Sequence, residues 1–85
     1  MRYLVELTSA AARALRRLPP TDRRHIAGCI DALPLAPRPA GARLLAGRER
    51  FHRVRVGDYR VIYQVSDRVL RVLVIRIGHR REVYR

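Results

Sequence analysis

Residues 53–63 read RVRVGDYRVIY, and this stretch decides the fold of the chain. Two runs with alternating side chains flank a glycine and an aspartate, a pattern typical of a β-hairpin with a two-residue turn. Such a turn sets Arg55 opposite Arg60. Because side chains alternate between the two faces of a strand, Arg53 lies on the same face as Arg55. The stretch therefore predicts three guanidinium groups on one surface of a sheet.

These three arginines predict an anion-binding surface. Like charges directly across a pair of strands destabilise the pair by a few tenths of a kcal/mol, up to roughly 1 kcal/mol. A fold that tolerates them usually has an anion to bind there, and the guanidinium fork matches the geometry of phosphate. We therefore expect Arg53, Arg55 and Arg60 to bind phosphate. The alternative is a solvated strand face on which the arginine stems cover apolar surface.

The overall charge points to the same class of partner. The chain has 85 residues and a formal net charge of +12, and all 19 of its basic residues are arginines. GC-rich coding accounts for the missing lysines, but the excess of cations favours a polyanion or an acidic protein as partner. The length predicts a single domain over residues 1–85. No apolar run is long enough for a signal peptide or a membrane span, so we expect a cytoplasmic protein.

The first part of the chain predicts a strand and two helices. Residues 3–7 alternate weakly and precede Thr8-Ser9, which suggests a short strand followed by the start of a helix. Apolar residues recur at helical spacing over residues 11–18 and again over residues 26–33. Two prolines separate these runs, and Thr21-Asp22 supply a capping oxygen and a negative charge at the start of the second helix. With so short a link, the helices should form an antiparallel pair.

The second part predicts a β-meander. The prolines and glycine of residues 34–41 predict a loop. Residues 50–56, 59–65 and 69–77 form three β-rich runs separated by turn residues. The last run is the most apolar and should be central in the sheet. The predicted fold class is α+β, with the helical hairpin packed on one face of a roughly four-stranded sheet.

The register of the last strand stays open. A two-residue and a three-residue loop at residues 66–68 place Arg71 and Arg76 on different faces. The sequence therefore does not decide which face of the sheet each of these arginines occupies.

The end of the chain adds a basic segment with an aromatic residue. Arg80, Arg81 and Arg85 flank Tyr84, and an aromatic ring beside arginines can hold an unstacked base while the cations bind its backbone. We expect Arg81 and Arg85 to bind RNA. His79 is a candidate for proton transfer, because an imidazole group can accept and donate a proton. The alternatives are a tail that keeps the terminus in solvent and a Tyr84 ring that packs into the core.

Other chemistry is not indicated. The chain has no carboxylate pair spaced for acid and base catalysis, no ligand set for a metal and no phosphate-binding glycine loop, so we expect neither metal nor cofactor. Cys29, the single cysteine, falls at helical spacing with apolar residues and reads as an inert thiol. If the chain is an enzyme, the residues present favour phosphodiester transfer without metal, in which a ribose 2′-hydroxyl attacks the neighbouring phosphorus.

Two segments resemble a known family. YRVIYQV at residues 59–65 and GHRREVY at residues 78–84 are similar in order and length to the RelE/ParE superfamily of toxins from bacterial type II toxin-antitoxin systems. The resemblance covers nearly the whole chain. It implies a toxin that is neutralised by an acidic antitoxin. The terminal tyrosine and the basic strand before Gly57 resemble the RelE-like branch, which cleaves mRNA in the ribosomal A site and leaves a 2′,3′-cyclic phosphate.

The resemblance also implies roles for single residues. Arg53 and Arg55 correspond to two basic residues, the first of which is implicated in activating the 2′-hydroxyl. Arg60 would stabilise the scissile phosphate. Arg80 would assist the leaving 5′-oxygen, and Tyr84 would stack on the cleaved nucleotide.

This chain departs from the family pattern in two ways. The family usually has lysine at the first two positions, and arginine is a poor proton acceptor. Either Arg53 acts only electrostatically, or His79 takes part in proton transfer. The tail between Gly78 and Tyr84 is also shorter than in well-known RelE toxins, and we expect no C-terminal helix of the kind that some members carry.

Two other functions fit the same fold. A ParE-like chain would instead inhibit DNA gyrase, and a non-enzymatic module would only bind nucleic acid or the antitoxin.

Overall fold

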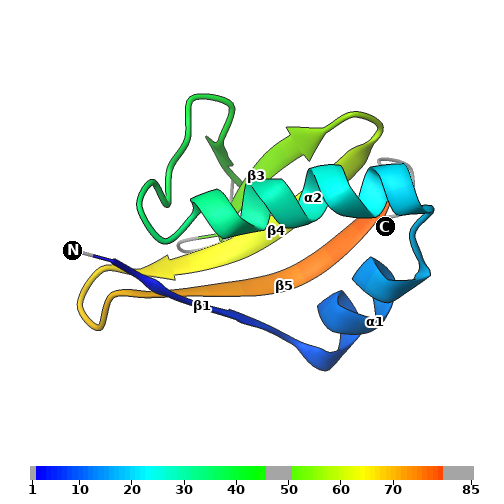
Figure 1. Cartoon of the computed structure of the whole chain (residues 1–85). Helices are drawn as coiled ribbons and strands as arrows, with labels where there is room; N and C mark the ends of the chain where they lie inside the picture. Colours follow the sequence, from blue (N-terminus) through cyan, green and yellow to red (C-terminus); the bar gives the residue numbers. More distant parts are fainter. Residues whose placement is uncertain (1, 46–50, 80–85) are drawn as a thin grey trace.

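A computed structural model describes residues 2–45 and 51–79 of the chain. Two helices and five strands follow one another in an α+β order that confirms the predicted fold class (Figure 1). Their bounds are β1 Leu4–Leu7, α1 Ser9–Arg17, α2 Pro20–Ala32, β2 Arg43–Leu44, β3 Phe51–Val56, β4 Tyr59–Ser66 and β5 Arg71–His79. Within these ranges, no helix has the length and apolar character needed to cross a bilayer.

The five strands form one sheet with the order β1-β5-β4-β3-β2. The meander β3-β4-β5 is antiparallel as predicted, and β1 pairs parallel with β5. The estimate of about four strands missed β2, which follows just after the predicted loop. A strand of two residues is too short to give an alternation signal in the sequence. β5 is an interior strand, but the middle position belongs to β4.

The helices begin where the sequence indicates, but by different means. Thr8 caps α1, because its hydroxyl oxygen accepts a hydrogen bond of 3.1 Å from the Ala11 backbone N–H. α2 starts at Pro20 and has no side-chain cap, so the expected capping role of Thr21 was wrong, while Asp22 does lie in the first turn. Proline at the first helical position needs no partner for a backbone N–H.

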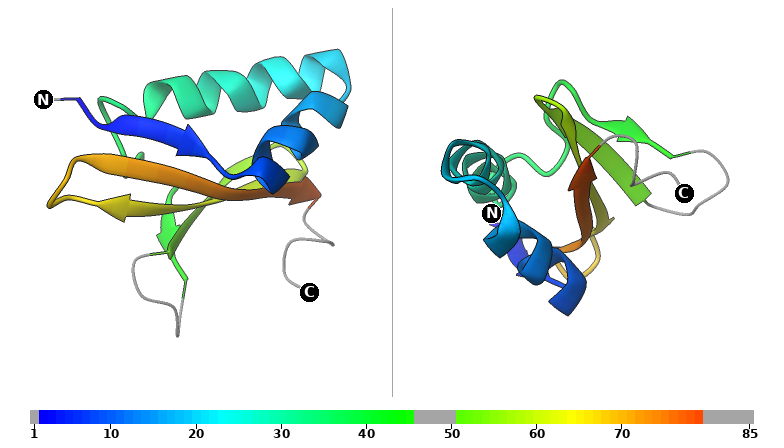
Figure 2. Two further views of the ribbon diagram at one scale, coloured as in Figure 1. Left: turned by 90° about the horizontal axis from the view of Figure 1, so that it is seen from below. Right: turned by 90° about the vertical axis from the view of Figure 1, so that its right-hand side faces the viewer.

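Both helices pack on one face of the sheet (Figure 2). The largest fully buried side chains are Tyr63, Ile26, Leu33, Val61, Val65, Val72 and Val74. They come from α2 and the neighbourhood of its end and from the helix-facing positions of β4 and β5. No described helix covers the opposite face, which we call the open face.

A β-bulge settles the register that the sequence left open. Arg71 pairs with Ser66 and Arg76 pairs with Ile62, and the register shifts between Ile62 and Tyr63. The shift inserts one extra residue into β5, so both arginines lie on the open face. Neither of the two loop lengths considered from the sequence predicts this result, because both assume an unbroken alternation along β5.

Candidate functional site

The hairpin of β3 and β4 brings the three predicted arginines together. Arg55 pairs directly with Arg60, and Arg53 pairs with Ile62 one step further from the turn. Gly57 has a φ of 60°, the left-handed conformation that favours glycine at the first central position of a tight hairpin turn. The predicted pairing is therefore confirmed. We call Arg53, Arg55 and Arg60 the arginine surface.

The three side chains differ in exposure. Arg55 is exposed and Arg53 is half-buried, whereas Arg60 is only 6% exposed. Charged side chains are rarely buried to this degree unless they are paired or bind a ligand. The surrounding residues therefore enclose the Arg60 side chain, whereas the Arg55 guanidinium beside it is open to solvent. Such an arrangement can bind a phosphodiester and stabilise added negative charge on it.

Two further arginines lie beside this surface and were missed as site residues. Arg43 on β2 pairs with Arg53, and Arg76 on β5 pairs with Ile62. Both are exposed. Arg43 lies beside the predicted loop, and Arg76 depends on the bulge. Arginine in a basic chain is too common to single either of them out without the strand pairing.

Of the carboxylates in the described sheet and its turns, two lie away from the arginine surface and one lies beside it. Glu6 is 3.3 Å from Arg71, at the β1 side of the open face. Asp67 is 2.7 Å from Arg38, beyond the end of β4. Asp58 lies in the hairpin turn next to the arginine surface. Positive charge therefore predominates over the part of the open face that β2, β3 and the first half of β4 form.

His79 lies on the other face of the sheet. It pairs with Tyr59, whose side chain packs on the helix side, and the two rings meet edge to face at 5.9 Å. Together with Ala14 and Leu18 they line a hollow between the end of α1 and the sheet. His79 is thus not part of the arginine surface, although Gly78, the residue before it, pairs with Arg60.

The remaining histidines and the cysteine also lie away from the arginine surface. His52 stacks on Tyr63 with 5.6 Å between ring centroids, and His25 is exposed on α2. Burial raises the pKa of the Cys29 thiol, which disfavours the reactive thiolate. In the described part of the chain, no three potential ligand side chains gather as a metal site would require.

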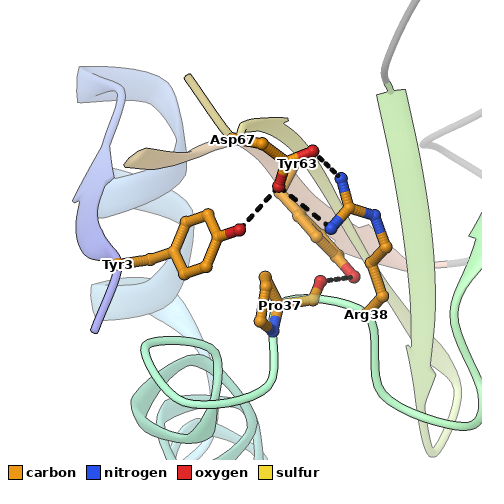
Figure 3. Close-up of polar contacts among 5 residues, drawn as sticks. All are labelled: Tyr3, Pro37, Arg38, Tyr63 and Asp67. Carbon is orange, nitrogen blue, oxygen red and sulfur yellow. Dashed lines mark hydrogen bonds and ion pairs between the residues drawn. The ribbon is translucent and has the colours of Figure 1, made fainter. Parts of the chain in front are cut away.

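Besides the arginine surface, a cluster of hydrogen-bonded residues fixes the proline-rich loop to the sheet (Figure 3). The Arg38 guanidinium donates hydrogen bonds of 3.1 and 2.7 Å to the two carboxylate oxygens of Asp67, and the Tyr3 hydroxyl donates one of 2.6 Å. The Tyr63 hydroxyl donates to the Pro37 carbonyl at 2.8 Å. We call these five residues the loop-anchoring cluster. It ties the N-terminal segment, the loop and the β4–β5 turn together.

This cluster shifts the acidity of its members. The hydrogen bond to Asp67 raises the pKa of Tyr3 and also that of Arg38. Burial raises the pKa of Tyr63 to about 12. All three groups therefore keep their protons at neutral pH, and the cluster is suited to holding structure rather than to moving protons.

Four predicted site residues fall outside the described residues. They are Arg80, Arg81, Tyr84 and Arg85. The chain enters this segment directly from β5, whose neighbour β4 carries Arg60.

Known proteins are similar to this chain in sequence. A family model described as "ParE toxin of type II toxin-antitoxin system, parDE" matches residues 5–84. The toxin RelE of Mycobacterium tuberculosis is 39% identical over 87 residues, covering 98% of this chain and 87% of that protein. Toxin RelG of the same organism is 33% identical, covering 100% of this chain and 99% of its own length.

A solved structure extends the likeness to the whole fold. The archaeal RelE-RelB complex from Pyrococcus horikoshii contains a chain that superimposes with a TM-score of 0.84 at 28% identity, covering 98% of this chain and 100% of the other. The matching family, the relatives and the shared α+β sheet agree with one another. The chain belongs to the RelE/ParE superfamily of toxins from type II toxin-antitoxin systems and is of the RelE type.

Proposed function

We propose that this toxin is a ribosome-dependent mRNA endoribonuclease. The observation that carries the proposal is Arg60, an arginine of 6% exposure that faces Arg55 directly across the hairpin. A pair of cations in this position costs stability unless an anion lies between or beside them. The guanidinium fork matches the geometry of an RNA phosphodiester, and the family likeness to RelE toxins supports RNA as the source of the phosphate.

In the proposed reaction, the 2′-hydroxyl loses its proton to water and its oxygen attacks the adjacent phosphorus. The bond from phosphorus to the 5′-oxygen breaks, and this oxygen takes up a proton from solvent, which gives a 2′,3′-cyclic phosphate and a free 5′-hydroxyl. Arg60 and Arg55 stabilise the negative charge that builds on the phosphate oxygens. Arginine does not accept a proton at working pH, and His79 lies on the opposite face. This placement favours an electrostatic role for Arg53. Arg80 would assist the leaving oxygen and Tyr84 would stack on the nucleotide.

The proposed protein partner is an acidic antitoxin. The structural relatives include complexes of RelE with RelB from Pyrococcus horikoshii and a RelBE2 toxin-antitoxin complex from Mycobacterium tuberculosis. A toxin of net charge +12 attracts an acidic chain at long range. We propose that such an antitoxin neutralises this toxin.

The test is a translation reaction with purified toxin, message and ribosomes. We expect the message to be cut only when ribosomes are present. Arg60→Ala should lower cleavage by about 10²–10³-fold, as the loss of one charge-stabilising donor does in other enzymes. Arg24→Ala is the matched control, because it removes one exposed arginine from α2. A message that stays intact with wild-type toxin and ribosomes would show the proposal to be wrong.

A second candidate is inhibition of DNA gyrase. The family model that matches residues 5–84 is described as a ParE toxin, which favours this alternative. On this function the arginine surface would serve partner contact alone. Gyrase supercoiling with accumulation of cleaved DNA complexes, measured beside the translation reaction, separates the two functions.

A further inference from the structure

We propose that Arg43 and Arg76 extend the arginine surface into a track that binds the RNA backbone on both sides of the cleaved phosphodiester. The choice of RNA as the ligand rests on the proposed function. We call Arg43, Arg53, Arg55, Arg60 and Arg76 the arginine track. The proposal adds two binding residues that no sequence pattern indicates.

Strand pairing places the track across the sheet. Arg43 pairs with Arg53, Arg53 with Ile62, and Ile62 with Arg76, so these four residues form one row over β2, β3, β4 and β5. Directly paired residues share a face, and neighbouring strands lie about 4.8 Å apart, so the row spans about 14 Å. The pair Arg55 and Arg60 lies in the adjacent row. A row of this length can contact more than one phosphate of an extended strand.

The β-bulge places Arg76 on the same face of the sheet as the arginine surface. Without the extra residue in β5, Arg71 and Arg76 would lie on opposite faces, because their separation is odd. The Thr8 hydroxyl donates a hydrogen bond of 2.8 Å to the carbonyl of Ile75, the residue before Arg76. Bulges often redirect a side chain next to a functional site. Here the cap of α1 also holds the backbone of the strand that presents Arg76.

The charges around the track favour a polyanion. Arg71 lies on the same face but is close to Glu6, which neutralises it. Arg43 and Arg76 are exposed, and the register gives neither of them a carboxylate as cross-strand neighbour among the described strands. An exposed guanidinium whose cross-strand partner in the described strands is Arg53 or Ile62 gains most from a ligand that carries repeated negative charge.

The test is the salt dependence of binding to a single-stranded RNA oligonucleotide, measured by fluorescence anisotropy. Each phosphate contact to a single strand contributes about 0.7 to the slope of log affinity against log salt concentration. Arg43→Ala and Arg76→Ala should each lower the slope by about 0.7, and the double variant by about 1.4. Arg76→Lys keeps the charge and should keep the slope.

Arg68→Ala is the matched control. It removes one exposed arginine in the β4–β5 turn, off the track, and should leave the slope unchanged. Variants of Arg43 and Arg76 with the wild-type slope would overturn the proposal, as would a wild-type chain that does not bind RNA. A lower slope in the variants supports the track even if wild-type toxin fails to cut message on ribosomes, in which case only the proposed cleavage is wrong.

Discussion

The loop-anchoring cluster and the arginine track use the same residue type in opposite ways. In the cluster, the Arg38 guanidinium meets both oxygens of the Asp67 carboxylate, and Tyr3 shares that carboxylate. In the track, Arg55 faces Arg60 across the hairpin. The comparison teaches that, among the described residues, the position of a carboxylate rather than the number of arginines distinguishes the anchoring arginine from those of the track.

Neither region supplies most of the stability of the fold. The Arg38 and Asp67 side chains are 42% and 51% exposed, and exposed ion pairs contribute at most about 1 kcal/mol. The paired arginines of the track cost a similar amount. Stability therefore comes from the apolar side chains between the helices and the sheet, and this core allows the open face to carry unfavourable charge.

The largest stability effect should come from the buried member of the cluster. Tyr63 is fully buried, and its hydroxyl donates to the Pro37 carbonyl. Tyr63→Phe leaves that carbonyl without its donor, so the free energy of unfolding should fall by about 1–2 kcal/mol at neutral pH. Tyr3→Phe, at a more exposed hydroxyl, should cost less. Equal effects of the two variants in urea unfolding would contradict this assignment.

The stabilising effect of the Tyr63 hydroxyl should depend on pH. Burial raises the pKa of Tyr63 to about 12, above the ordinary value of 10.0. The folded chain therefore holds this proton more tightly than the unfolded chain, and its contribution to stability is complete below about pH 10 and is lost between about pH 10 and 12. The gap in unfolding free energy between wild type and Tyr63→Phe should narrow across that window.

A smaller effect is expected at the exposed carboxylate. Asp67→Ala removes the partner of Arg38 and of the Tyr3 hydroxyl and should lower the free energy of unfolding by about 1 kcal/mol. For a domain of this size, that is a fall in Tm of about 4–8 °C. The salt slope of RNA binding should not change, because Asp67 is far from the track along β4. A changed slope would mean that the two regions are not independent.

The smallest effects should differ in sign between two positions on the open face. Arg55→Glu replaces a repulsive pair with Arg60 by an attractive one and should raise the free energy of unfolding by about 0.2–1 kcal/mol over Arg55→Gln. Arg71→Glu replaces the attraction to Glu6 by repulsion and should lower it by a similar amount. Thermal unfolding measures both. The same sign at both positions would contradict the contrast between neutralised and track arginines.

The sequence predicts the hairpin and its arginines because that information is local. Two-residue periodicity and the turn at Gly57 fix the pairing of Arg55 with Arg60 without reference to the rest of the chain. β2 and the bulge in β5 depend on contacts between distant segments. The position of Arg43 requires the loop to return to β3. The position of Arg76 requires one extra residue in β5, which becomes visible in the pairing of β5 with β4.

The most direct test of the account is ribosome-dependent cleavage by the Arg55→Glu variant, measured on the same preparation as its stability. The account holds that the arginine surface carries its charge for a phosphodiester and loses stability as a result. It predicts a variant that is more stable than Arg55→Gln but cuts message at least about 100-fold more slowly than wild type. A variant that is more stable and cuts message at the wild-type rate would contradict it.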